Sequence, residues 1–233
     1  MSDGPLQSFP VDPANPGEVL ACAGLARLAA RIGPEAASGF VRHSDRWHFE
    51  IPFDLHLLRR IDTSPLTVAD DQLQVDGLRL DWWQEGWGLN PEFKFWAGQQ
   101  TPQSVLNHLL RASRNADPRD WQVHLAPTSG RLGVDPLGAW DSLELGWSIN
   151  EHKDFRQLCR PCVEWLAFIA LQCFPVRGDR HHGFRYHLWR PARLELAVLA
   201  FAGSGRHALH GYRAETDRSG SNTYLKTATP LQE

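Results

Sequence analysis

The stretch of the chain best suited to chemistry is residues 177–193, which reads RGDRHHGFRYHLWRPAR. It holds five arginines and three histidines against the single acid Asp179. Apolar side chains alternate with basic or aromatic ones in its second half, with Phe184, Tyr186 and Leu188 at one set of positions and Arg185, His187 and Trp189 at the other. Because successive side chains of a strand point to opposite faces, this pattern predicts a strand with one apolar face and one basic, aromatic face.

Such a face is typical of a nucleic-acid groove, in which arginine contacts the phosphate backbone and a base stacks on an aromatic ring. In this interpretation the backbone passes Arg185 while a base stacks on Trp189. The candidate nucleic-acid-binding residues, which include flanking arginines and two residues of the central strands, are Arg79, Lys94, Arg180, Arg185, His187, Trp189, Arg190 and Arg193. The alternative is an exposed basic strand that keeps the surface soluble or pairs with the chain's 27 acidic residues.

The histidines of the same stretch, His181, His182 and His187, could serve as acid and base in RNA cleavage because imidazole titrates near neutral pH. A metal-independent endoribonuclease is therefore the catalytic alternative. Histidine beside several arginines is also typical of a group that contacts phosphate or solvent. No serine elbow and no pair of metal-binding carboxylates stands out elsewhere in the sequence, so we expect a non-catalytic protein.

A zinc site would need four ligands: the CxxC pair Cys159 and Cys162, then Cys173, and either His181 or His182. If residues 161–174 form a continuous helix, Cys162 and Cys173 lie roughly 16 Å apart along its axis, too far to share a metal. We therefore interpret the cysteines as buried free thiols in a reducing compartment. We expect neither a metal nor another cofactor.

A second candidate site for an anion lies at the start of a predicted helix, with Thr101 at the N-cap and Pro102 at the first helical position. A helix N-terminus presents unpaired backbone N–H groups and the positive end of the helix dipole. Lys94, Gln99 and Gln100 are near it in sequence, and they could contact a phosphate. A capped surface helix with solvated glutamines is the alternative.

Local signals locate the elements that must position these residues. Asn15 as N-cap, Pro16 and Glu18 predict a helix over residues 16–32 that ends at Gly33. The Asp76-Gly77 pair between alternating apolar runs predicts a β-hairpin, because both central positions of a type I′ turn need positive φ. The nearly all-apolar residues 161–174 predict a central buried helix.

The other elements follow from apolar periodicity and turn residues. Strands are predicted at residues 47–51, 93–96, 121–125 and 208–214, a short helix at 54–61, a helical turn within 136–145, and a helix or strand at 194–201. Together they predict an α+β fold, with a mixed, mostly antiparallel sheet and packed helices in a single compact domain. We expect a flexible arm at residues 1–10, the domain at 11–216 and a polar tail at 217–233.

Composition narrows the class of protein. The chain has 233 residues, 42% of them apolar, so it can bury a core, and its net charge of −3 argues against coating nucleic acid with the whole surface. No apolar run reaches the roughly 18 residues that a membrane-spanning helix needs, and the N-terminus lacks the pattern of a signal peptide. We expect a cytoplasmic protein without a membrane partner.

A resemblance to a known family covers most of residues 8–203 and is carried by five segments: NPGEVLACAGLARLA, FKFWAGQQT, AWDSLELGWS, VEWLAFIALQ and YHLWRPARL. They resemble a small accessory protein of type I-G CRISPR systems, formerly called type I-U. Such proteins are encoded beside the interference genes and are treated as a large-subunit-like component of the effector or as an extension of its helicase-nuclease. The matching segments are packing patterns and transfer no catalytic residue.

The resemblance implies a non-catalytic subunit of an RNA-guided effector complex in antiviral defence, in which base pairing reads sequence and protein reads backbone shape. Its implied partners are the other CRISPR effector subunits together with crRNA or target DNA. Besides the endoribonuclease, a pure protein–protein scaffold, whose basic strand would meet acidic neighbours, remains an alternative function.

Overall fold

The computed structural model describes residues 5–69, 72–80, 100–128, 130–138, 158–179, 181–219 and 222–232. The α-helices in these ranges are α1 (Pro16–Ile32), α2 (Leu58–Thr63), α3 (Pro102–Ser113), α4 (Pro161–Ala170) and α5 (Leu194–Phe201). Single 3-10 turns are η1 (Leu55–Leu57), η3 (Pro118–Asp120) and η4 (Pro136–Gly138). No helix in the described ranges is both long and apolar enough to cross a membrane.

The strands form small antiparallel sheets, and two of these sheets organise the fold. The N-terminal sheet has the order β1-β3-β2 and consists of β1 (Leu6–Val11), β2 (Gly39–His43) and β3 (Arg46–Pro52). The C-terminal sheet has the order β14-β11-β10-β9 and consists of β9 (Arg177–Asp179), β10 (Gly183–Trp189), β11 (Ala208–Ala214) and β14 (Thr229–Pro230).

The smaller sheets complete the strand content of the described residues. They are the meander of β4 (Thr67–Ala69), β5 (Gln72–Val75) and β6 (Leu78–Leu80), the hairpin of β12 (Thr216–Ser219) with β13 (Asn222–Leu225), and the pair of β7 (Ala126–Pro127) with β8 (Leu158–Cys159). Every one of these pairings is antiparallel. The helices pack around one hydrophobic core, so the predicted α+β fold is confirmed.

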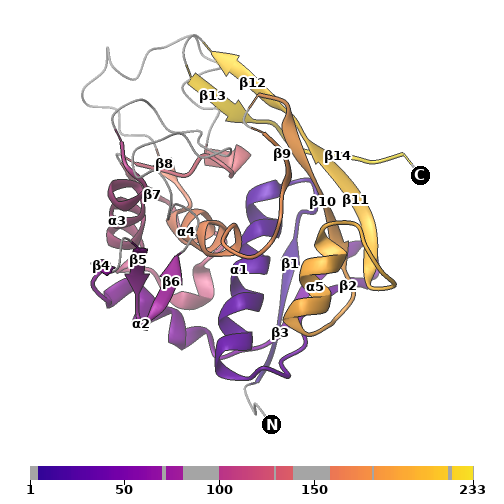
Figure 1. Cartoon of the computed structure of the whole chain (residues 1–233), viewed down its shortest axis with the longest axis horizontal. Coiled ribbons are helices and arrows are strands. Elements are labelled where there is room, and N and C mark those ends of the chain that lie inside the picture. Colours follow the sequence, from indigo (N-terminus) through magenta and orange to yellow (C-terminus); the bar gives the residue numbers. More distant parts are fainter. Residues whose placement is uncertain are drawn as a thin grey trace.

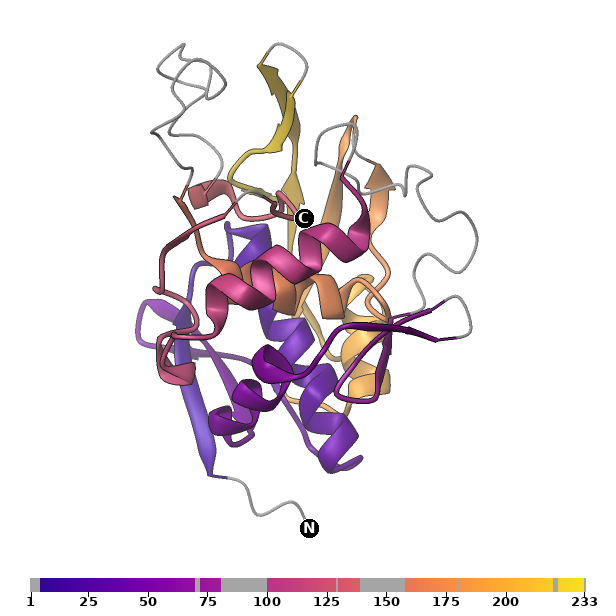
Figure 2. The ribbon, with the colours of Figure 1, turned by 90° about the vertical axis from the view of Figure 1, so that its left-hand side faces the viewer.

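Helices α1 and α4 form the centre of the molecule. The C-terminal sheet with α5 lies on one side of this pair, and α3 with the β4–β6 meander lies on the other (Figure 1). A view from the side of α3 shows the same layering, with the meander in front and α5 behind (Figure 2). At the crossing of α1 and α4, a Cβ added to Gly24 would lie 2.1 Å from the carbonyl oxygen of Leu166, so only glycine allows this close approach.

The predicted start of α1 is confirmed, but its capping box is not completed. The side chain of Asn15 accepts a hydrogen bond of 3.1 Å from the backbone N–H of Glu18. The Glu18 carboxylate does not return to the N-cap N–H, as a capping box requires. It accepts instead from the Asp12 N–H at 2.9 Å and from Arg160 at 2.6 Å.

The prediction for α4 is confirmed in burial and corrected in length. Every residue from Pro161 to Ala170 is buried, as the apolar sequence indicates. The helix ends at Ala170, where the chain makes a turn that includes Phe174 instead of continuing. Phe174 still packs in the core, with 1% of its surface exposed.

The predicted hairpin is confirmed at β5 and β6. Asp76 and Gly77 have φ values of 47° and 68°, as the turn requires. The backbone carbonyl of Asp76 accepts a hydrogen bond from Arg31 of α1. Its carboxylate pairs with Arg60 of α2 at 3.3 Å. These contacts attach the turn to two helices.

The predictions of a flexible arm and a polar tail are wrong where the structure describes them. Leu6–Val11 is an edge strand paired with β3. Proline has no backbone N–H to donate to a neighbouring strand, so Pro10 is tolerated at the edge of the sheet. In residues 217–233, β13 and β14 are ordered, and the backbone N–H of Ala228 donates to the carbonyl of Ala14 at 2.7 Å. The Tyr186 hydroxyl likewise donates to the carbonyl of Pro13 at 2.8 Å.

Other predicted elements are confirmed, corrected or outside the described residues. Strands β3 and β11, the 54–61 helix as η1 and α2, and α5 as a helix agree with the sequence. The predicted strand at 121–125 is wrong, because a turn follows η3 and buries Trp121 completely. The helical turn within 136–145 exists at η4, while the rest of that segment and the predicted strand at 93–96 lie outside the described residues.

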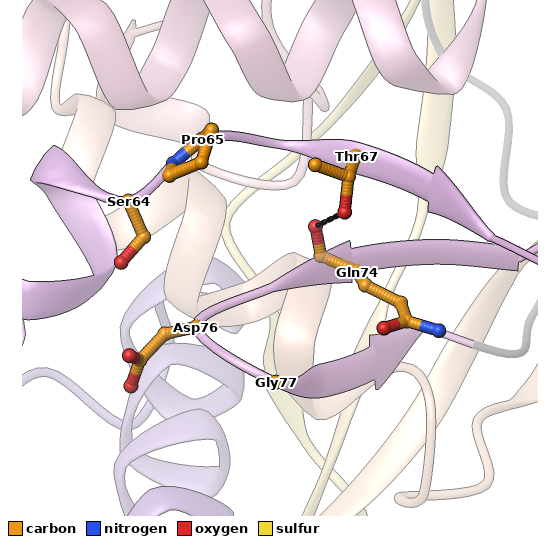
Figure 3. A pocket seen from close by; sticks show the side chains of 6 residues that line it. All are labelled: Ser64, Pro65, Thr67, Gln74, Asp76 and Gly77. Carbon is orange, nitrogen blue, oxygen red and sulfur yellow. Dashed lines mark hydrogen bonds between the residues drawn. The ribbon is translucent and has the colours of Figure 1, made fainter.

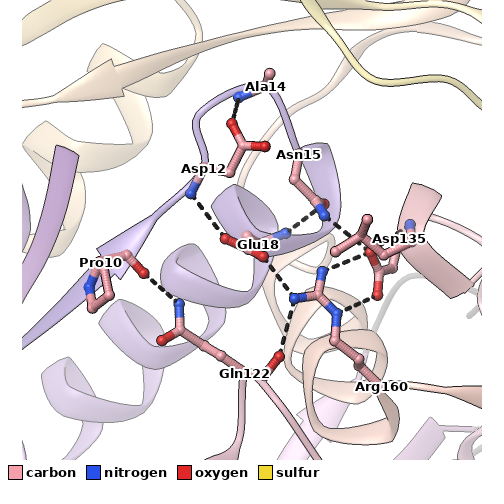
Figure 4. A network of polar contacts seen from close by, with 9 residues as sticks. Pro10, Asp12, Ala14, Asn15, Glu18, Gln122, Asp135 and Arg160 are labelled. Atoms are coloured by element: carbon pink, nitrogen blue, oxygen red, sulfur yellow. Dashed lines mark hydrogen bonds and ion pairs between the residues drawn. The ribbon is translucent and has the colours of Figure 1, made fainter. Parts of the chain in front are cut away.

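A buried ionic network links α1, α4 and the segment before η4 (Figure 4). The guanidinium of Arg160, just before α4, donates to both carboxylate oxygens of Asp135 at 2.7 Å. It also donates to Glu18 at 2.6 Å and to the carbonyl of Gln122 at 3.0 Å. Burial opposes the charge on Arg160, but the hydrogen bonds to Asp135 and Glu18 outweigh it and raise the pKa of the guanidinium.

A second carboxylate extends the network from α4. Glu164 is 1% exposed and accepts hydrogen bonds from the backbone N–H groups of Gly133 at 2.7 Å and Asp135 at 3.1 Å. Burial raises its pKa to about 7, assisted by the neighbouring Asp135. The side chain of Asn15 donates to Asp135 at 3.0 Å, which connects this cluster back to the N-cap of α1. The network is interior to the fold and therefore serves its architecture.

Replacing Arg160 should destabilise the fold strongly, because the buried carboxylates of Glu18 and Asp135 would lose the guanidinium with which they pair. We expect Arg160→Ala to lower the free energy of unfolding by about 3–5 kcal/mol in chemical denaturation. The matched control is Arg119→Ala, which removes an exposed arginine whose partner Asp117 is also near the surface, and it should change stability little. Equal effects of the two substitutions would contradict the assigned role of the network.

Candidate nucleic-acid interface

Strand β10 has the two-faced pattern that the sequence predicts. Phe184, Tyr186 and Leu188 are buried, Arg185 is exposed and His187 is half-buried. The turn that leads into the strand depends on glycine: Gly183 has φ of 77°, and a Cβ there would lie 1.8 Å from the carbonyl oxygen of Ala214. The backbone of β10 is thereby held tightly against β11, and Arg185 projects from the outer face.

The prediction that a base stacks on Trp189 is wrong, because this side chain is fully buried. The register between β10 and β11 shifts beside this residue, because two steps on β10, from His187 to Trp189, match three steps on β11. The ring of Trp189 lies 4.8 Å from that of Phe40 and 5.5 Å from that of Phe174, measured between centroids. Its indole N–H donates to the carbonyl of Ser38 at 3.0 Å.

The structure pairs Arg185 with an arginine that the sequence reasoning missed. Arg213 of β11 lies directly opposite Arg185, and both side chains are exposed. On the other side, Arg177 of β9 occupies the register position opposite Arg185. Arg213 also has a carboxylate nearby, since its Nε lies 3.4 Å from Glu215. Three neighbouring strands therefore carry arginine at matching positions.

The remaining predicted residues of β10 and its C-terminal end do not converge on Arg185. The imidazole of His187 fills the space over two glycines, since a Cβ at Gly203 or Gly211 would lie 2.6 Å from the ring. Arg190 is exposed at the far end of the strand, where its backbone N–H donates to the carbonyl of His207 at 2.8 Å.

Arg193 and Arg79 are also exposed but lie apart from that strand position. Arg193 pairs with Glu35, whose two carboxylate oxygens are 3.0 and 3.1 Å from its Nη1. Arg79 belongs to β6, on the opposite side of the α1–α4 pair from β10 (Figure 1). The predicted interface is therefore not one groove over all these residues. Lys94 and Arg180 lie outside the described residues.

The sequence itself shows that basic residues continue past β10 into β11. Residues 181–214, from the turn before β10 to the end of β11, contain five arginines and five histidines but only one acid, Glu195. The basic stretch 177–193 ends before Arg206, His210 and Arg213, which are exposed on or just before β11. We call residues 181–214 the basic unit.

The three histidines considered for catalysis are not brought together. His181 and His182 are exposed neighbours in the turn before β10, with ring centroids 6.4 Å apart. His187 lies four residues beyond Gly183, which is roughly 13 Å along a strand. An acid and a base acting on one phosphodiester must both reach it, so His187 cannot act with the other two in this geometry.

The four cysteines are free thiols, and three of them are buried. Burial raises the pKa of Cys162 to about 12, so this thiol stays protonated at neutral pH. Among the described residues, no group of three His, Cys, Asp or Glu side chains is arranged to hold a metal. The alternative anion site at α3 keeps its Thr101 cap, with a bond of 3.1 Å from Ser104 N–H, while Lys94 and Gln99 lie outside the described residues.

A shallow pocket of about 220 Å³ lies beside the β5–β6 turn (Figure 3). Its lining is Ser64, Pro65, Thr67, Gln74, Asp76 and Gly77. The only titratable side chain in that lining is Asp76, whose carboxylate is 3.3 Å from Arg60 and 3.5 Å from Arg31. These contacts assign the Asp76 carboxylate to an ion-paired structural role, and the pocket presents no acid–base pair.

Asp62 of α2 is the other buried carboxylate with a shifted pKa. It is 5% exposed, and its Oδ1 has no hydrogen-bond partner among the described residues. Burial raises its pKa to about 7, against the attraction of Arg114 and Arg59. An ionised carboxylate is costly to bury without partners, which is why the neutral form is favoured.

The raised pKa of Asp62 makes stability depend on pH. The unfolded chain ionises Asp62 near pH 4 and the folded chain near pH 7, so this group's contribution to stability is present below pH 4 and is lost as pH rises to 7. We expect the free energy of unfolding to fall with a slope of at most about 1.4 kcal/mol per pH unit from this group. Denaturation of the protein and of Asp62→Asn at several pH values measures the difference, and parallel profiles would contradict it.

Comparison with known proteins adds no relative: no protein-family model matches the chain, no curated protein matches it, and no solved structure matches it.

Proposed function

We propose that the chain is a non-catalytic subunit of a type I CRISPR RNA-guided effector complex, which contributes to binding of crRNA or target DNA and to assembly in antiviral defence. The observation that carries the nucleic-acid part of this proposal is the exposed pair of Arg185 and Arg213. The resemblance of the sequence to type I-G accessory proteins directs the choice of complex. Such a complex would act in the cytoplasm.

The electrostatics of the arginine pair favour an anionic ligand. Like charges directly opposite each other on neighbouring strands destabilise a sheet. Arg185 and Arg213 stand in this relation, and among the side chains that the structure describes the recorded counter-charge is Glu215, itself exposed, on the side of Arg213. A phosphate placed between the two guanidinium groups would balance both, and arginine binds phosphate oxygens through paired N–H donors.

The charge of the basic unit supports a contact with a phosphate backbone rather than with a single anion. The basic unit holds five arginines and one acid, whereas the whole chain has a net charge of −3. A local positive surface on such a protein attracts a polyanion without causing non-specific binding over the whole surface. Arg190 and Arg206 are further exposed arginines of the basic unit, at the other end of β10 and β11.

Assembly with neighbouring subunits is supported by the outer face of α5. Leu196 and Leu199 are 37% and 55% exposed, three residues apart on the same side of the helix. Exposed leucines adjacent to a charged surface are typical of a protein–protein contact. A pure scaffold is therefore the second candidate function.

Removing the arginine pair should weaken binding in a salt-dependent way. We expect Arg185→Ala/Arg213→Ala to flatten the plot of log affinity against log salt for a single-stranded RNA by about 1.4 units, because two phosphate contacts no longer release counterions. Fluorescence anisotropy across a salt series measures this slope. The proposal requires that the unfolding midpoint stays close to that of the parent protein.

The matched control is Arg111→Ala/Arg119→Ala, which removes the same charge from exposed arginines of α3 and η3. It should leave the slope unchanged. An equal flattening by both double variants would indicate diffuse attraction instead of a site. An unchanged slope and affinity in the Arg185 and Arg213 variant would move the function to the scaffold.

The endoribonuclease alternative is tested by a cleavage assay. Incubation of the purified chain with labelled repeat RNA should yield no cleavage, since His187 does not reach the other two histidines. Cleavage that disappears with His181→Ala or His187→Ala would instead establish the enzyme. Gel analysis of the labelled products distinguishes these outcomes.

A further inference from the structure

Trp47 is a tryptophan at the surface junction of the two main sheets. It lies on β3, opposite Arg42 of β2 and Val11 of β1. Its side chain packs against the edge of the core and is only half-buried, unlike Trp165 and Trp189, which are fully buried.

The ring contacts of Trp47 are with polar groups. The guanidinium carbon of Arg42 lies 6.0 Å from the ring centroid, and the imidazole of His210 on β11 lies 5.7 Å away in an edge contact. Arg42 and His210 are themselves exposed. The buried tryptophans Trp165 and Trp189 satisfy their indole N–H groups with Ser113 and Ser38, respectively, whereas the N–H of Trp47 has no protein acceptor in the described part of the chain.

We propose that Trp47, Arg42 and His210 form a stacking site for an unpaired nucleobase of a single-stranded nucleic acid, an inference that rests on the proposed function. The Arg42 guanidinium lies over the indole ring of Trp47, so a base stacks on this face by displacing it. The displaced guanidinium can then stack on the base or pair with its phosphate. Bases within a duplex are already stacked and paired, so the ligand of this site is single-stranded.

The stacking site is separate from the arginine pair. His210 and Arg213 are three residues apart on β11, roughly 10 Å. His210 contacts Trp47 of β3, whereas Arg213 lies opposite Arg185 of β10. One site therefore contacts bases and the other contacts phosphates. Their contributions can be removed one at a time, because stacking affects affinity without releasing counterions.

The experiment compares two probes that differ only in their bases: a short single-stranded oligoadenylate and an abasic oligonucleotide of the same length. We expect Trp47→Ala to weaken binding of the oligoadenylate roughly 5- to 150-fold and to leave binding of the abasic probe unchanged. The salt slope should stay at the parental value. Trp47→Phe keeps an aromatic ring and should retain most of the affinity, which also guards against a folding defect in the alanine variant.

Each other result overturns the inference. An unaltered affinity of Trp47→Ala for oligoadenylate, or an equal loss with both probes, would remove base stacking at Trp47. If the Arg185 and Arg213 variant still flattens the salt slope in that case, the proposed function stands without this site. If the parent protein binds neither probe, the proposed function and the stacking site fail together.

Discussion

The guanidinium of Arg160 sets where four separate parts of the chain must meet. A buried charge is tolerated only if its counter-charges and acceptors surround it, and here they come from Glu18 on α1, Gln122 after η3 and Asp135 before η4, while Arg160 itself leads into α4. Because removing any one partner leaves a charge uncompensated, alternative packings of α1 against α4 are disfavoured. The central helix pair, around which both main sheets are arranged, therefore depends on the contacts of Arg160.

Much of the fold could be predicted because its signals are local. The Asn15 cap, the Asp76-Gly77 turn and the apolar α4 each depend on a few adjacent residues. The strands at the two ends could not be predicted in this way. Leu6–Val11 is ordered by β3, and β14 by β11, and neither partner is adjacent in sequence. Their own residues are too polar or too few to show a strand pattern before the partner is known.

In the candidate interface, too, features set by adjacent residues could be predicted, whereas features set by strand pairing could not. Strand alternation predicts the exposure of Arg185, since each side chain follows from its neighbours. The aromatic contacts and the hydrogen bond to Ser38 that hold Trp189 inside come from residues distant in sequence, and the match of Arg185 with Arg213 is a property of the β10–β11 register. Likewise the sequence predicts the β3 strand that holds Trp47, but only the packing of two sheets brings His210 to its ring. Residues that act as pairs across strands are therefore found by structure.

The hydrogen bonds that close the segment before α1 also constrain how the protein can be made. Ala14 accepts from Ala228, and Pro13 accepts from Tyr186, so the beginning of the chain is completed by residues that the ribosome adds late. Contacts of such long sequence separation form slowly, because loop-closure entropy must be overcome first. The apolar side of α1 has no α4 to cover it until that helix has emerged. In the nascent chain, the contacts of Pro13 and Ala14 can therefore form only after Tyr186 and Ala228 have been added, and until α4 has emerged the apolar side of α1 is exposed.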